Sequence, residues 1–339
     1  VNGFVPDQII GMRGDGVAHL KLNGKLDALD INGDLTLHDA YIVSVPYGVE
    51  MRFDEKPLKI DNSKVVFEDF RMYSHNNQAL VIGGNVDLSD LSRIKPNLSM
   101  RARNFLLVDS KQMRKSQVFG KAYINFAATM RGPLSALDMR GRVDVLGSTN
   151  MTYVMRDSPL TNDNRLAELV TFVDFNDKIV PQVERPTIEG LAINLTINID
   201  QGALLFCQLN ASNTNYLDLI GGGSLRLVYS ADEMRLNGRY TISNGEMKYS
   251  LPVIPLKTFD IREGTYVEFK GDVTNPTLNI TAMEETTANV TADGTSRAVR
   301  FNCGVVITKT LNDMGLEFAI EAPEDLTINS DLLSKSVAE

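Results

Sequence analysis

The sequence NGKLDALDINGDLTL, residues 23–37, returns as RGPLSALDMRGRVDV at residues 131–145. Two glycines, two leucines, one alanine and one aspartate are identical between the stretches, and the other apolar positions exchange only Ile for Met or Leu for Val. Repeats of this kind are typical of folds that stack copies of one supersecondary unit. The chain is therefore predicted to repeat a turn followed by a strand.

A third, looser copy lies further along, where LNGRYTI at residues 236–242 matches INGDLTL at residues 31–37. The polar positions change most between copies: Asp34 corresponds to Arg142 and then to Arg239. Because the apolar positions persist while the charges change sign, the repeated feature is an apolar face rather than a catalytic group.

Alternation with a period of two residues dominates the chain, and its clearest example is INLTINID at residues 193–200. Only a β-strand places alternate residues on opposite faces. Asn-Gly pairs at 23–24, 32–33 and 237–238 supply hairpin turns. These patterns predict an all-β chain of roughly twenty strands, each about 5–8 residues long, with mostly antiparallel connections.

Two regions break the alternation. Residues 104–120 are predicted to form a polar connector, and residues 160–176 a short helical insertion. The stretch that follows contains two prolines and is predicted to change the course of the chain. We therefore expect residues 1–176 to form the N-terminal part, and residues 177–339 the C-terminal part, of one β-structure.

The composition excludes several classes of function. The 339 residues are 43% apolar and 23% charged, which is typical of a globular chain. A net charge of −9 argues against nucleic acid or an anionic membrane surface as a partner. The three histidines and two isolated cysteines lack the paired spacing of a metal site, and we find no cofactor fingerprint and no nucleophile motif, so neither a cofactor nor an enzyme activity is predicted.

Three short motifs have simpler explanations than binding sites. Residues 13–15 read Arg-Gly-Asp, a tripeptide that occurs often by chance. The glycine run at residues 221–223 lacks the lysine of a phosphate loop and is interpreted as a bulge or sharp turn. Cys207 and Cys303 lie at apolar positions of strand-like segments and are interpreted as small buried hydrophobes, although a disulfide between them stays open.

The apolar positions are a uniform set of Leu, Ile, Val and Met with a few Phe and Tyr. Such a face can form the closed core of a sandwich or β-solenoid, or it can line a continuous apolar trough. Periodicity alone does not decide between a closed core and an open trough.

A resemblance to a known family bears on this choice. Its segments are NYLDLIGGGSLRLVY (215–229), MRLNGRYTISNG (234–245), KTFDIREGTYVEFKGD (257–272) and NPTLNITA (275–282). The ordered motifs G-x-L-x-L-x-Y, L-x-G-x-Y-x-I-x-x-G, F-x-I-x-x-G, G-D and N-P-x-L-x-I-x-A resemble the C-terminal domain of the TamB family. The resemblance is strong over residues 215–282 and weaker over the repeats between residues 20 and 150.

The resemblance implies an elongated, twisted, antiparallel-rich sheet that curls into a half-pipe with an apolar concave interior, as in the AsmA-like, bridge-like lipid-transfer group of the Gram-negative envelope. The implied function is phospholipid transport between the inner and outer membranes, assistance to outer-membrane protein assembly, or both. The implied partners are phospholipid or another acyl-chain ligand and an outer-membrane barrel of the TamA or BamA type. The implied location is the periplasm, with an inner-membrane anchor outside this chain and the end of the family domain beyond Glu339.

The alternating apolar positions are the predicted lining of this interior and its contacts with lipid. These candidates are Leu35, Leu37, Val143, Val145, Ile193, Leu195, Ile197, Ile199, Leu225, Leu227, Tyr229, Leu236, Tyr240, Ile242, Phe259, Ile261, Val267, Phe269, Leu278 and Ile280. An acyl chain in water costs about 0.8 kcal/mol per methylene, so a long apolar lining suits it better than a discrete pocket.

Two alternatives remain from the sequence. A secreted binding or adhesin module with a β-solenoid or sandwich fold would pack the same apolar positions into a closed core. A glycan-active enzyme on a β-solenoid would need aromatic platforms, and a chain with 7% aromatic residues and no Trp favours it least.

Overall fold

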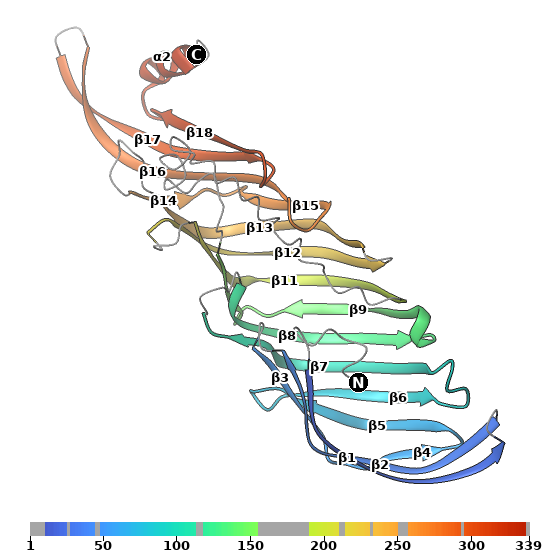
Figure 1. Cartoon of the computed structure of the whole chain (residues 1–339). Helices are drawn as coiled ribbons and strands as arrows, with labels where there is room; N and C mark the ends of the chain where they lie inside the picture. Colours follow the sequence, from blue (N-terminus) through green and yellow to red (C-terminus); the bar gives the residue numbers. More distant parts are fainter. Residues whose placement is uncertain are drawn as a thin grey trace, which may run out of the picture.

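The computed structural model describes residues 11–25, 28–44, 48–112, 118–154, 190–209, 214–230, 233–249, 257–292 and 295–336. Eighteen strands within these residues form one sheet (Figure 1). The first ten are β1 (Gly11–Lys25), β2 (Ala28–Ser44), β3 (Val49–Phe53), β4 (Leu58–Asp61), β5 (Lys64–Tyr73), β6 (Ala79–Asp87), β7 (Lys95–Ser110), β8 (Val118–Arg131), β9 (Leu137–Val145) and β10 (Asn150–Val154). The others are β11 (Leu191–Gln208), β12 (Tyr216–Ser230), β13 (Glu233–Tyr249), β14 (Lys257–Ile261), β15 (Tyr266–Asp272), β16 (Thr277–Ala292), β17 (Thr295–Lys309) and β18 (Met314–Glu321). A 3-10 turn, η2 (Leu134–Ala136), and a helix, α2 (Leu326–Ser336), complete the described elements.

Most strands pair antiparallel with a strand close to them in the chain, which makes the sheet a meander. The strands lie across the molecule and stack along its length, with β1 at one end and β18 and α2 at the other (Figure 1). The prediction of an elongated, curled, all-β sheet is confirmed.

The stack contains fifteen levels, and at three of them two short strands take the place of one long strand. β3 and β4 lie between β2 and β5, β9 and β10 lie between β8 and β11, and β14 and β15 lie between β13 and β16. The two short strands are separated each time by four residues, 54–57, 146–149 and 262–265. Because strand pairing is interrupted at these points, the sheet can bend there and curl.

The pairing around β11 joins the two predicted parts of the chain. β11 runs parallel to β9 and β10, although most of the sheet is antiparallel. The N-terminal and C-terminal parts therefore share one sheet. The helical insertion predicted at 160–176 and the predicted boundary after residue 176 lie outside the described residues and stay predictions.

Several strands are longer than the sequence predicts, and β7 shows the reason. Residues 104–110 belong to β7, so the connector predicted at 104–120 is too long at this end. A register shift between Ala102 and Phe105 marks a bulge, where Asn104 has a φ of 45°. The extra residue of a bulge breaks the alternation of apolar and polar residues, although the strand pairing continues. The sequence therefore suggests a connector where the strand in fact goes on. Phe105, at 2% exposure, is part of the core.

The duplicated stretch forms the same unit twice, a hairpin from β1 to β2 and another from β8 to β9. A Cβ on Gly33 would lie 1.9 Å from the carbonyl oxygen of His19, and one on Gly141 would lie 2.4 Å from that of Ala127. Glycine recurs at this position because the backbone of the neighbouring strand leaves no room for a side chain.

The glycine run at 221–223 accompanies two irregularities in pairing. The register shifts between Ile199 and Ala203 where β11 meets β12, and between Ile220 and Gly221 where β12 meets β13. The extra residues belong to the neighbouring strands, 200–202 in β11 and Ser243 in β13, so the glycine run permits bulges opposite it and is itself regular strand.

Candidate functional site

The candidate site is one face of the sheet, and the strand registers define it. Residues directly opposite each other in paired strands point to the same face, so a chain of such pairs forms a cross-strand row. One row reads Met72, Leu80, Ala102, Phe126, Val143, Ile197, Leu225, Gly238 and Phe269. A second row reads Phe70, Ile82, Met100, Ala128, Gly141, Leu195, Leu227, Leu236 and Gly271. A third row reads Phe105, Ile124, Val145, Ile199, Gly223, Tyr240, Val267 and Leu278.

These three rows contain only apolar, aromatic and glycine residues. Two of them cross from β5 to β15 and the third from β7 to β16, so the face is apolar along most of the molecule. We call this the apolar face.

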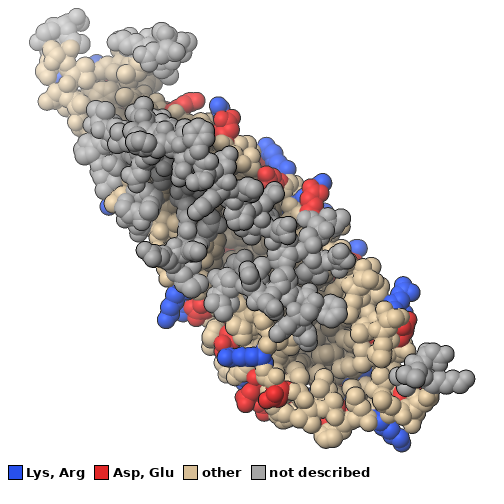
Figure 2. Space-filling view, viewed as in Figure 1, with Lys and Arg blue, Asp and Glu red and all other residues tan. Residues whose placement is uncertain are grey.

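The opposite face is polar. Its central row reads Arg71, Val81, Arg101, Ala127, Arg142, Thr196, Arg226, Asn237 and Lys270. In the view of Figure 2, Lys, Arg, Asp and Glu side chains gather along the margins of the molecule. The sheet thus separates charge from apolar surface.

The predicted lining residues fall into two groups by burial. The first group lies between β2 and β15, is mostly half-buried, and comprises Leu35, Leu37, Val143, Val145, Ile193, Leu195, Ile197, Ile199, Leu225, Leu227, Tyr229, Leu236, Val267 and Phe269. Within it, Leu195 and Leu225 are the most buried, at 8% and 7% exposure. The second group is fully packed and comprises Tyr240, Ile242, Phe259, Ile261, Leu278 and Ile280.

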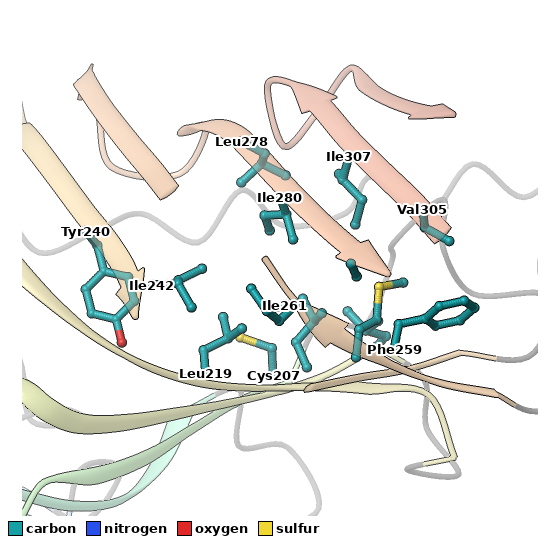
Figure 3. Close-up of a cluster of buried hydrophobic side chains, with 14 residues drawn as sticks. Cys207, Leu219, Tyr240, Ile242, Phe259, Ile261, Leu278, Ile280, Val305 and Ile307 are labelled. Atoms are coloured by element: carbon teal, nitrogen blue, oxygen red, sulfur yellow. The ribbon is translucent and has the colours of Figure 1, made fainter. Parts of the chain in front are cut away.

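The second group belongs to a closed hydrophobic core near the C-terminal end (Figure 3). Met247 and Leu209 have no exposure in this core, and Val305 and Ile307 have 1% each. Side chains from β11 to β17 meet there, including β14, which lies between β13 and β16. At this position the apolar face contains a sealed core.

At both ends of the sheet the apolar face carries exposed side chains. On β1, Leu20 and Leu22 are 51% and 57% exposed, and on β18, Phe318 and Ile320 are 58% and 52% exposed. Leu22 lies opposite the buried Ile31, and Phe318 opposite the buried Val305, so these side chains continue the same face. The apolar face therefore reaches the terminal strands at both ends of the stack.

The TamB C-terminal domain family matches residues 68–335. The chain belongs to the TamB family. No curated protein matches it. The match begins within β5 and ends within α2, so it takes in all of the three rows. The resemblance seen at 215–282 is thus confirmed and extends over most of the chain.

Membership makes the chain a TamB-like protein of the cell envelope. The TamB family is a transport and assembly module and is not a known enzyme family. Among the described residues, no helix is both long and apolar enough to cross a membrane.

Some buried residues of the TamB-like face escape the sequence pattern. Phe70 and Met72 are 2% and 6% exposed, yet simple alternation does not select them. A register shift between Phe67 and Phe70 marks a bulge at Glu68 and Asp69. A charged pair inside an otherwise apolar strand is the signal in the sequence that could have located this bulge.

Two polar atoms lie within the closed core. Burial raises the pKa of the Cys207 thiol to about 12 and that of Tyr240 to about 12, so both groups stay neutral. Cys207 and Cys303 form no disulfide with each other in this structure, and Cys303 is half-buried rather than buried. The interpretation of Cys207 as a small buried hydrophobe is confirmed. In the described part of the chain no three His, Cys, Asp or Glu side chains are placed to hold a metal.

A depression of about 810 Å³ lies on the polar face, across β5 to β9. Arg71, Arg101, Arg103 and Arg142 line it together with Asp144, and Arg142 is paired with Asp144 at 3.0 Å. In the central row Val81 and Ala127 lie between the arginines, and their short side chains leave room for this depression. The depression is separated from the apolar face by the sheet itself.

Proposed function

We propose that the chain is a periplasmic part of a TamB-like protein whose apolar face carries the acyl chains of phospholipids between the inner and outer membranes. The full-length protein would be anchored in the inner membrane by a segment outside this chain. The observation that carries the proposal is the set of three cross-strand rows without a charged residue. At about 0.8 kcal/mol per methylene, an acyl chain gains most from a continuous lining of this kind.

The purely apolar side chains of the three rows favour lipid over polypeptide as the cargo of this face. A peptide lying on the rows would meet side chains only, so its own N–H and C=O groups would lack partners. An acyl chain has no such groups and needs apolar contact alone. The lining also offers many equivalent positions, which suits a cargo that must move.

A role in outer-membrane protein assembly would use a different part of the molecule. Terminal strands β1 and β18 carry exposed apolar side chains, and an exposed strand edge is where another strand can add to a sheet. A barrel of the TamA or BamA type is the partner that this second role would require.

The test is native mass spectrometry of the purified chain, combined with photocrosslinking. A photoreactive residue at Ile197, on the apolar face, should crosslink to co-purifying phospholipid, whereas one at the exposed Thr196, on the polar face, should not. Equal crosslinking at both positions, or a tight isotherm with a single saturable site, would contradict a mobile cargo on this face.

A further inference from the structure

The depression across β5 to β9 contains two arginines without a counter-ion. Arg71 on β5 and Arg103 on β7 line it, and among the described residues their guanidinium groups have neither an ion pair nor a hydrogen bond. The other four cations of the central row are each held by a partner: Arg101 by Asp69, Arg142 by Asp144, Arg226 by Asn194 and Lys270 by Glu268. The chain has a net charge of −9, yet this depression carries two positive charges in excess.

Two bulges direct these arginines toward the depression. The bulge at Glu68 and Asp69 comes just before Arg71, and the bulge at Asn104 comes just after Arg103. A bulge bends its strand and changes the direction of nearby side chains. The strands β5 and β7 are about 10 Å apart, with β6 between them, so two long arginine side chains can close around one group across that gap.

Other polar groups of the depression add donors rather than acceptors. The Asn125 side-chain oxygen accepts a hydrogen bond from the Asn104 N–H at 2.9 Å, which leaves the side-chain NH₂ group to donate. The only carboxylate in the described lining, Asp144, has both oxygens engaged, one by Arg142 at 3.0 Å and the other by Asn198 at 2.8 Å. An excess of guanidinium and amide N–H donors suits an oxyanion.

The size and the floor of the depression indicate a ligand larger than a lone anion. Its volume of about 810 Å³ is in the range of small-molecule sites, which is about 300–1,000 Å³. Ala79, Val81 and Ala127 form a floor of short apolar side chains, and Gln78 adds a side-chain amide without a partner among the described residues. A sugar phosphate has the complementary groups: an anion for the arginines, hydroxyls for the amides and a C–H face for the floor.

We propose that the depression binds a soluble phosphorylated sugar, with its phosphate between Arg71 and Arg103 and its ring on the floor. A phosphate monoester carries about −1.5 to −2 charges at neutral pH, which matches the two uncompensated guanidinium groups. The net charge of −9 opposes approach to an anionic bilayer and therefore favours a soluble ligand over a lipid headgroup. The site lies across the sheet from the three apolar rows, so it does not depend on the lipid-carrying function.

Isothermal titration calorimetry of the 339-residue chain tests the site, with glucose 6-phosphate as the probe. The wild-type chain should bind it, and binding should weaken as salt rises, because the contact is largely electrostatic. Arg71→Gln and Arg103→Gln should each weaken binding about ten- to hundredfold, the range for a hydrogen bond to a charged group. Arg235→Gln is the matched control, because it makes the same change of charge in β13, outside the depression.

Ala127→Leu tests the floor without changing any charge. Ala127 is exposed, so the fold should tolerate the larger side chain. This variant should lose glucose 6-phosphate while it keeps the affinity of the wild type for inorganic phosphate, because only the sugar ring needs the floor. Urea midpoints equal to that of the wild type would show that each variant is folded.

Four outcomes would overturn the proposal. Unchanged binding in both arginine variants would exclude the site. Equal affinity of the wild type for glucose 6-phosphate and inorganic phosphate would exclude the sugar, and tighter binding of a tetra-aspartate peptide would point to an acidic polypeptide instead. Binding to vesicles that contain phosphatidylinositol 4-phosphate, without binding of free glucose 6-phosphate, would assign the depression to a lipid headgroup. All four outcomes leave lipid binding at the apolar face unaffected.

Discussion

Asp218 on β12 lies directly opposite Glu246 on β13, so two carboxylates face each other on the polar face. The Tyr216 hydroxyl donates a hydrogen bond to Glu246 Oε1 at 3.0 Å, while Asp218 Oδ1 is buried without a partner among the described residues. Like charges directly opposite in a sheet are destabilising. Burial, and after it the Glu246 carboxylate, raises the pKa of Asp218 above its usual 3.8.

Asp218→Asn should therefore stabilise the fold, by about 0.5 kcal/mol on the scale of cross-strand pairs. The folded state holds the Asp218 proton more tightly than the unfolded state, so the charge costs stability above the raised pKa. The difference between variant and wild type should be largest at neutral pH and vanish well below pH 3.8, where Asp218 is protonated in both states. Urea unfolding at several pH values measures it.

Glu268→Gln is the control of opposite sign. Hydrogen bonds from Lys270 and Arg239 lower the pKa of Glu268, so its charge stabilises the folded state above its usual pKa. This variant should lose stability at neutral pH and match the wild type in acid. If Asp218→Asn and Glu268→Gln changed the stability to urea at neutral pH in the same direction, the opposite electrostatic roles of these two carboxylates would be refuted.

Leu227→Asp should remove lipid from the purified chain without unfolding it. Leu227 is half-buried on the apolar face, and a carboxylate there would disfavour acyl chains, so we expect co-purifying phospholipid to fall at least about tenfold. Thr196→Asp is the control, because Thr196 is exposed on the polar face opposite Arg226. Circular dichroism checks the fold, and complete unfolding of Leu227→Asp would show instead that this position belongs to a closed core.

Met247→Ala should destabilise the chain strongly. Met247 has no exposure within the C-terminal core, and truncation of a buried methionine costs about 2–5 kcal/mol. Met234→Ala, at a methionine that is 44% exposed on the same strand, should change stability by less than about 0.5 kcal/mol. Urea midpoints give the comparison, and similar midpoints for the two variants would mean that the core is not tightly packed.

Gly141→Ala should also cost stability, by about 1–3 kcal/mol. The added methyl would lie 2.4 Å from the Ala127 carbonyl oxygen and 2.5 Å from the Ala128 Cβ, so β8 and β9 would have to separate. Gly16→Ala makes contacts no closer than 3.7 Å and should be neutral or slightly stabilising. A harmless Gly141→Ala would show that the duplicated glycine is not needed for close approach of the strands.

The sequence predicts the class of fold and the composition of the apolar face well, because both follow from local alternation. Residues 193–200 alternate without a break, and the structure places them in β11 with Leu195 in the second apolar row. Prediction fails at bulges such as that at Asn104, where one extra residue reverses the alternation. It also cannot separate Ile242 from Ile193: the first is sealed in the core and the second half-buried, a difference set by strands distant in sequence.

The length and the width of the apolar face are set independently. Fifteen levels have fourteen intervals of about 4.8 Å and extend over about 67 Å, so the number of strands sets the length of the apolar face. The number of residues per strand sets its width. One more hairpin of the type found at 23–37 and 131–145 would add roughly 10 Å of reach without altering the cross-section. Duplication of that short segment is therefore a way to set the length of the molecule.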